Sequence, residues 1–205
     1  MQYHVTVNIS PDLFSENIRY LRQRVLPARL CVVMKADAYG HGLQALAPVA
    51  VRSGAACFDI RTSWDFDNPV ELQPVMSMKT QVMEVRTVPS GVPIGYGSLF
   101  RTSRKTRIAT IPTGFGEGYP RSLFNKGIVL IRGQRCPVIG RVSLNITTID
   151  ITDLDADVGW GEEVVLVGRQ GGEVITFEEL ADKFDSVHTE INLMAGHMNE
   201  RSYRD

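Results

Sequence analysis

Residues 32–42 read VVMKADAYGHG, an apolar run that ends in a lysine and continues into a turn with two glycines. The apolar run begins at Leu30, and residues 43–51 have the apolar spacing of a helix. Lys35 is therefore predicted where a buried parallel strand passes into a helix. This is the end of the strand at which α/β folds place their chemistry.

Two interpretations of Lys35 follow from these residues alone. A lysine at the end of a strand is most often a solvated surface residue. A desolvated lysine amine can instead form a Schiff base with a carbonyl cofactor. Gly40 and Gly42 favour the second interpretation, because glycines let backbone amides approach an anion at the start of the following helix.

The pattern on either side of this stretch predicts a chain in two parts. Up to residue 60 the order is β-α-β-α-β, which is the beginning of a parallel α/β arrangement. Residues 61–69 are polar and aromatic without a period, and we place a boundary there. The rest is rich in predicted strands, at 75–86, 107–111, 164–167 and 173–175, with a hairpin at 128–142 and the strand at 146–151 as its neighbour. Helices are predicted at 177–184 and about 187–198. We expect a partial α/β barrel fragment over residues 10–62 and an antiparallel β-rich domain over residues 70–205.

Composition narrows the classes of function. A formal net charge of −1 gives no electrostatic footprint for nucleic acid or an anionic membrane. No apolar run approaches the ~20 residues of a membrane span, and no signal-peptide core follows the N-terminus. The three cysteines are widely spaced, unlike a disulfide framework or a metal site, and His41 is expected to belong to the turn. We therefore predict a cytoplasmic protein without a metal ion.

The stretch VVMKADAYGHG resembles the pyridoxal-phosphate lysine segment of the alanine racemase family. Residues 72–78, 94–97, 114–121 and 138–142 resemble successive blocks of that family's C-terminal domain. The resemblance implies a TIM-type barrel followed by a β domain to which the strand at residues 3–9 is added. It also implies pyridoxal 5′-phosphate as cofactor, alanine as substrate and a homodimer.

The resemblance also implies roles for individual residues. Lys35 stands in the place of the lysine that holds the cofactor as an aldimine, and Tyr39 in that of a phosphate-contacting tyrosine. Phe115 occupies the position of a catalytic tyrosine that serves one face of the substrate from across the dimer interface, while the lysine serves the other. Leu144 occupies a position near the substrate, and Thr189 that of a further active-site tyrosine.

Two departures from the family leave the function open. A TIM-type barrel takes about 250 residues, whereas residues 10–62 have room for two βα units and one more strand. A phenyl ring at position 115 has no transferable proton. One interpretation is a racemase that interconverts L- and D-alanine through a Lys35 aldimine, or a related racemase with another amino-acid substrate. The alternative is a non-catalytic or engineered minimal remnant that folds, dimerises or binds the cofactor weakly.

Overall fold

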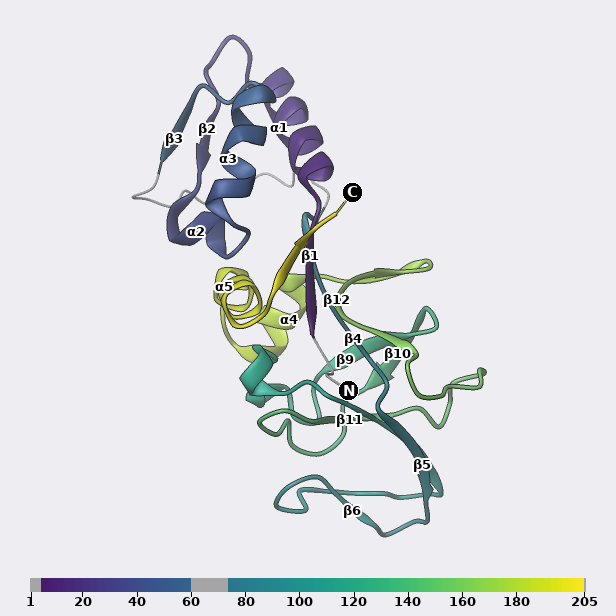
Figure 1. Cartoon of the computed structure of the whole chain (residues 1–205). Helices are drawn as coiled ribbons and strands as arrows, with labels where there is room; N and C mark the ends of the chain where they lie inside the picture. Colours follow the sequence, from purple (N-terminus) through teal and green to yellow (C-terminus); the bar gives the residue numbers. More distant parts are fainter. Residues whose placement is uncertain (1–4, 60–73, 205) are drawn as a thin grey trace.

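The computed structural model describes residues 5–59 and 74–204. The first residues of the strand predicted at 3–9 and the boundary predicted at 61–69 lie outside these ranges. Figure 1 shows two parts, a small α/β fragment and a larger β-rich part. Strand β1 leads from the β-rich part into the fragment.

The α/β fragment begins with a helix that is capped as its sequence indicates. Helix α1 (Pro11–Val25) has proline at its first position, and the Ser10 hydroxyl accepts a hydrogen bond from the backbone nitrogen of Leu13 at 3.1 Å. It packs against α3 (Leu43–Arg52), where the buried hydroxyls of Ser15 and Ser53 lie 2.7 Å apart. Strands β2 (Cys31–Val33) and β3 (Cys57–Asp59) pair in parallel beside these helices.

The prediction that these strands are buried is wrong. Cys31 and Cys57 are exposed, and Val32 and Val33 are only half-buried. Within the described residues, β2 and β3 pair with each other and with no third strand. A closed barrel would cover both faces of each strand, and two strands cannot do this.

The β-rich part is built on a 7-stranded sheet in the order β10-β9-β12-β4-β1-β14, with β13 attached to β12. Its strands are β1 (Thr6–Ile9), β4 (Met76–Gln81), β9 (Ile128–Ile131), β10 (Gln134–Pro137), β12 (Glu163–Gln170), β13 (Glu173–Ile175) and β14 (Arg201–Tyr203). The first strand of the chain thus pairs antiparallel with β4 and parallel with β14. This pairing supports assigning it to the β domain, while the domain limits stay a prediction.

The single long strand predicted at residues 75–86 is wrong, because two strands replace it. β4 belongs to the large sheet, and β5 (Glu84–Val88) belongs to a 3-stranded sheet in the order β11-β8-β5. At the break, the backbone nitrogen of Val82 donates to the carbonyl oxygen of Glu162, and that of Met83 donates to the carbonyl oxygen of Thr110. The chain changes sheets here, and alternation of apolar residues alone does not reveal such a change.

The neighbours of the predicted hairpin also differ from expectation. The hairpin itself forms from β9 and β10, with Arg132 and Gly133 in its turn at φ of 53° and 72°. β11 (Thr147–Asp150) touches it through one bridge and pairs along its length with β8 (Thr106–Ile111) instead. Strands β6 (Pro93–Ile94) and β7 (Phe100–Arg101) form a separate small pair.

The two C-terminal helices begin where the sequence predicts them. The Thr176 hydroxyl accepts from the backbone nitrogen of Glu179, which starts α4 (Phe177–Phe184). Helix α5 (His188–Met198) follows and leads into β14. Both helices pack on the large sheet, and α5 faces the α/β fragment (Figure 1).

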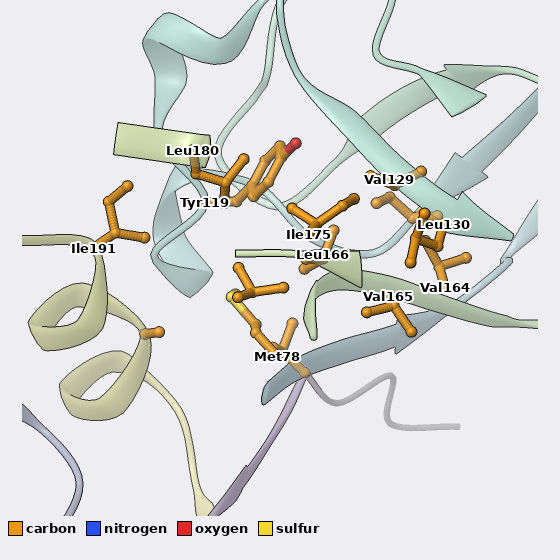
Figure 2. Close-up of a cluster of buried hydrophobic side chains, with 14 of the residues drawn as sticks. Met78, Tyr119, Val129, Leu130, Val164, Val165, Leu166, Ile175, Leu180 and Ile191 are labelled. Carbon is orange, nitrogen blue, oxygen red and sulfur yellow. The ribbon is translucent and has the colours of Figure 1, made fainter. Parts of the chain in front are cut away.

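One apolar core joins the sheet, the helices and part of the fragment. Figure 2 shows its centre, where Met78, Leu166 and Ile191 come from a strand, its neighbour and α5. The same cluster includes Met34 and Leu46 from the α/β fragment. The residue before Lys35 is therefore anchored in the core that the β-rich part provides.

Candidate active site

Lys35 begins a turn of left-handed helix. The segment α2 (Lys35–Tyr39) has φ of 49°, 56°, 54° and 52° at Ala36, Asp37, Ala38 and Tyr39. A left-handed conformation costs an L-residue other than glycine roughly 1–2 kcal/mol. Four such residues in succession persist only if the surrounding structure holds them.

Local hydrogen bonds supply part of this support. The backbone nitrogen of Gly40 donates to the carbonyl of Ala36 at 3.1 Å. His41 lies in the turn, as predicted, and its Nδ1 contacts the carbonyl oxygens of Ala38 at 2.9 Å and Tyr39 at 3.2 Å. Burial lowers the pKa of His41, so the ring stays neutral and Nδ1–H donates to these oxygens.

The turn places the Lys35 amine beside the ring of Tyr39. Lys35 is half-buried, and its Nζ lies 5.7 Å from the centroid of the Tyr39 ring. In the part of the chain that the structure describes, Lys35 makes no ion pair. A primary amine can form an imine with the aldehyde of pyridoxal phosphate, and a phenol can hydrogen-bond its phosphate, so the chemistry of these two groups fits the cofactor.

Phe115 and Leu144, two further residues assigned from the sequence, lie together elsewhere. Phe115 begins a short 3₁₀ helix, η1 (Phe115–Glu117), and its backbone nitrogen donates to the carbonyl of Ser143 at 3.0 Å. The next nitrogen, of Gly116, donates to the carbonyl of Leu144 at 2.7 Å. The Leu144 side chain is 55% exposed, so it is free to contact another molecule.

Helix α5 separates the two pairs of residues. Gly40, at the end of the Lys35 turn, lies against Asn192 and Gly196 of α5. Gly118, just after η1, lies against Met194 on the opposite face of the same helix. Within one chain, the structure therefore does not bring Phe115 to Lys35. Thr189 is half-buried near the start of α5.

A hollow of about 660 Å³ opens beside Phe115. Arg121 reaches over the Phe115 ring, with its Cζ 5.9 Å from the ring centroid. The hollow is lined by Phe115, Pro120, Arg121, Ser122, Phe124, Arg141 and Met194. Residue type and spacing predict no role for Arg121 or Arg141, although they lie inside the blocks 114–121 and 138–142 that carry the family resemblance.

Tyr119 is not available as a substitute for the missing tyrosine. It is completely buried in the core (Figure 2), and burial raises the pKa of its hydroxyl far above the neutral range. A hydroxyl in this position can neither meet a substrate nor exchange protons with one.

The described residues hold neither a metal-binding cluster nor a membrane-spanning helix. They contain no group of three or more His, Cys, Asp or Glu side chains arranged to hold a metal ion. Their helices also include none with the length and apolar character needed to cross a membrane.

Comparisons with known proteins match both parts of the chain. The family model described as "Alanine racemase, C-terminal domain" matches residues 75–203, and the one described as "Alanine racemase, N-terminal domain" matches residues 9–64. The alanine racemase of Halothermothrix orenii is 39% identical over 155 residues, which take in 76% of this chain and 41% of that relative. The alanine racemase of Syntrophobacter fumaroxidans is 40% identical over 154 residues, with 75% and 41% covered.

Solved structures show the same fold. The alanine racemase from Bartonella henselae with covalently bound pyridoxal phosphate aligns with a TM-score of 0.87 at 17% identity, over 98% of this chain and 99% of that one. The alanine racemase from Bacillus anthracis with bound L-Ala-P aligns with a TM-score of 0.86 at 16% identity, over 100% and 96%. These alignments run along both chains almost throughout, whereas the sequence alignments are confined to about two fifths of each relative.

The match of the C-terminal family model over most of the chain decides the class. This chain belongs to the alanine racemase family. The predicted fold, a truncated α/β barrel followed by a β-rich domain, is confirmed. The chain spans about two fifths of the length of the curated relatives it matches.

Proposed function

We propose that this chain acts as a pyridoxal-phosphate-dependent racemase that interconverts L- and D-alanine, with Lys35 as the residue that holds the cofactor. The observation that carries the proposal is the half-buried Lys35 amine beside Tyr39, at the start of a left-handed turn. The alanine racemase relatives and the family models over both parts of the chain support it. The site is predicted to work in the cytoplasm.

Each assigned residue has a defined task in this proposal. The cofactor, when bound, supplies an electron sink that acidifies the α-proton of an amino acid. The Tyr39 hydroxyl would hold the cofactor phosphate as a hydrogen-bond donor, and Lys35 Nζ would take up or return the α-proton on one face of the substrate. Leu144 contacts the substrate from the exposed loop after Val142.

A second copy of the chain completes the site in this proposal. Phe115 lies across α5 from the Lys35 turn of its own chain, so a homodimer is the arrangement that brings it to a partner's lysine. At that position a phenyl ring shapes the substrate site but moves no proton. The loss of one acid–base group typically costs about 10²–10⁴-fold in rate, or roughly 3–5 kcal/mol.

This difference between the two faces defines the test. With L- and D-alanine in deuterated water, exchange of the α-proton with retained configuration should outrun racemisation for one enantiomer, since only Lys35 moves a proton. Phe115→Tyr should raise the racemisation rate by about 10²-fold or more. Racemisation as fast as exchange in the unmodified chain would contradict the role given to Phe115.

The alternative is a remnant that binds cofactor without turning over alanine. Two observations favour it. Phe115 has no transferable proton, and the strands β2 and β3 that precede and flank the lysine segment are only partly buried. The same experiment separates the two functions. If neither enantiomer exchanges its α-proton beyond the rate with free pyridoxal phosphate, the chain is a remnant.

A further inference from the structure

Arg201, near the C-terminal end of the chain, reaches the turn that follows Lys35. It lies on β14, which runs beside β1 toward the α/β fragment (Figure 1). Its Nη1 pairs with the carboxylate of Asp37 and also donates to the carbonyl oxygen of Gly40 at 3.2 Å. The two side chains are 28% and 35% exposed, so water screens the pair only partly.

The Asp37 carboxylate also contacts the next helix, α3. One carboxylate oxygen accepts a hydrogen bond from Nη1 of Arg201, and the other accepts from the backbone nitrogen of Leu43, the first residue of α3, at 2.7 Å. The single carboxylate therefore ties the left-handed turn, the start of α3 and β14 together. Charge-assisted hydrogen bonds of this kind are the strong ones.

Close backbone packing fixes the same turn from a second side. A Cβ on Gly196 of α5 would overlap the carbonyl oxygen of Gly40, and a Cβ on Gly42 would overlap the hydroxyl of Tyr203. The turn is thus seated on α5 and β14 with no space for a side chain between them. The ion pair lies at the edge of this contact, where Arg201 reaches Gly40 as well.

We propose that Arg201 and Asp37 are a positioning pair that holds the left-handed turn and, through it, sets where the Lys35 amine points. This proposal rests on the proposed role of Lys35. In this proposal neither residue contacts the cofactor or the substrate. Their effect is to hold four residues in a conformation that L-amino acids otherwise avoid.

The charged and titratable groups around Asp37 come from β14, α5 and the turn itself. Arg201 lies on β14, His197 on α5 acts on the carboxylate at longer range, and Tyr203 acts on Arg201 from the same strand. His41 follows in the turn itself and stays neutral. Among these groups, Arg201 is the one that contacts Asp37 directly.

Amide hydrogen exchange of the full chain without cofactor tests the pair directly. Asp37→Asn keeps an acceptor for Leu43 and suits a left-handed position, while it removes the charge that Arg201 binds. We expect Asp37→Asn and Arg201→Gln each to speed exchange over residues 36–43 by about five- to tenfold. The double variant should add little, because both changes break one interaction.

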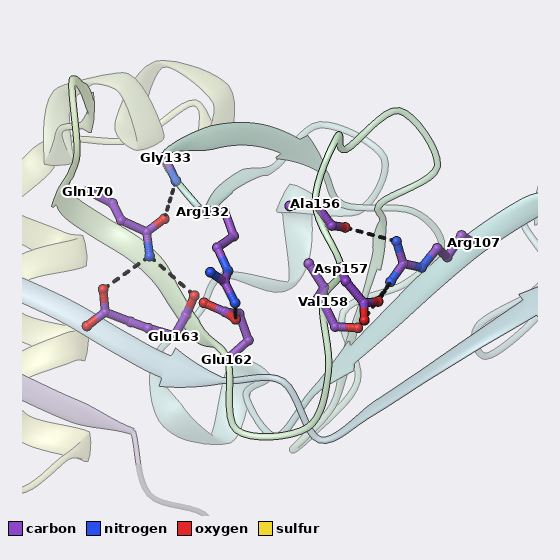
Figure 3. A network of polar contacts seen from close by, with 9 residues as sticks. All are labelled: Arg107, Arg132, Gly133, Ala156, Asp157, Val158, Glu162, Glu163 and Gln170. Carbon is purple, nitrogen blue, oxygen red and sulfur yellow. Dashed lines mark hydrogen bonds and ion pairs between the residues drawn. The ribbon is translucent and has the colours of Figure 1, made fainter.

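A matched control removes an arginine ion pair elsewhere. Arg132, in the β9–β10 turn, pairs with Glu162, just before β12, at 2.6 Å (Figure 3), far in sequence from the Lys35 turn. Arg132→Gln should leave exchange over residues 36–43 unchanged. Unchanged exchange in Asp37→Asn and Arg201→Gln as well would overturn the proposal.

A spectroscopic readout separates positioning from general loosening. With pyridoxal phosphate added, circular dichroism in the cofactor band, divided by the absorbance of bound cofactor, should fall in Arg201→Gln. Arg201→Lys should restore part of this ratio, because an ammonium keeps the charge that pairs with Asp37 but lacks the planar guanidinium geometry that lets Nη1 contact Asp37 and Gly40 together. A ratio that stays constant while occupancy falls would reduce the pair to a structural role and overturn the positioning.

The failure of the proposed function gives a different result. If the unmodified chain takes up no cofactor at Lys35 yet the exchange effects are present, the role of Lys35 is wrong. The pair then still holds the turn, and only its link to the cofactor is lost.

Discussion

His41 is a histidine enclosed in the turn that it stabilises. Its Nδ1–H bridges the carbonyls of Ala38 and Tyr39, and burial lowers the pKa of the ring. The neutral ring is therefore part of the folded structure, and a protonated ring would lose solvation without gaining a counterion. Asp37 in the same turn shows the opposite case, since the hydrogen bond from Arg201 lowers its pKa by favouring the charged carboxylate.

These pKa shifts predict how the chain responds to acid. His41 contributes its full stability above the ordinary histidine pKa of about 6.5. As the pH falls from there through the lower pKa of the folded state, the unfolded chain takes up the proton first, and stability is lost. Urea unfolding at pH 7, 6 and 5 should show this decline, and His41→Asn should flatten it. Replacing the exposed His188 by Asn is the control, and a decline unchanged in His41→Asn would contradict the assignment.

Asp37 extends the same argument to lower pH. Its stabilising contribution is present above the ordinary aspartate pKa of about 3.9 and is lost as the pH falls through the lower folded-state value. The two groups thus act in successive pH ranges, with His41 first.

At the scale of elements, the contact between the end of α2 and α5 leaves no room for a side chain. Gly196 presents no side chain to the carbonyl of Gly40, and backbone stands on both sides of the contact. A clash of this kind cannot be relieved by rotating a side chain.

Gly196→Ala therefore tests whether α5 seats the lysine turn. Alanine favours a helix by about 1 kcal/mol over glycine, but the overlap should cost more, so we expect a net loss of about 1–3 kcal/mol in the free energy of unfolding. Gly172→Ala is the matched control, because nothing lies within 4 Å of its added Cβ, and it should stay within about 0.5 kcal/mol. Equal stabilities of the two variants in urea would show that α5 does not seat the turn as described.

The same contact explains what the sequence could and could not predict. The strand before Lys35 and the helix from Leu43 follow from apolar spacing, which acts locally. The left-handed turn does not, because Ala36 and Ala38 carry no signal for that hand and one aspartate, Asp37, is only a weak one. Its support comes from Arg201, 164 residues away, on a strand too short and polar to be recognised.

The candidate site divides in the same way. The family resemblance assigned Lys35, Tyr39, Phe115 and Leu144, and their assigned roles stay predictions. The structure brings them together as two pairs on opposite sides of α5. Sequence spacing could not predict this division, because it depends on how α5 packs between the two segments.

At the scale of the whole molecule, the two ends of the chain meet in one sheet. β1 lies between β4 and β14, and its Val7 and Ile9 are completely buried. The segment that leads into the α/β fragment is thus an interior strand of the other part. The lysine-bearing fragment is thus linked to the β domain through β1, which precedes it, and through Arg201 on β14.

Removing residues 1–9 should therefore damage the β domain rather than the fragment. The loss of three buried apolar side chains, Val5, Val7 and Ile9, at about 1.5–3 kcal/mol each is a large share of a typical stability of about 5–15 kcal/mol. We expect amide protection in β4 and β14 to fall in the shortened chain, and a synthetic peptide of residues 1–9 to restore it. A scrambled peptide is the control, and full protection without the strand would contradict its interior place.

The most direct test of the central claim is to find where pyridoxal phosphate attaches. The full chain is incubated with the cofactor and reduced with borohydride, and its peptides are mapped by mass spectrometry. The account predicts a pyridoxyl group on Lys35 at stoichiometric cofactor, background labelling of the exposed Lys126, and loss of the main label in Lys35→Ala. Labelling of Lys35 no greater than that of Lys126, or a main label that survives in Lys35→Ala, would contradict it.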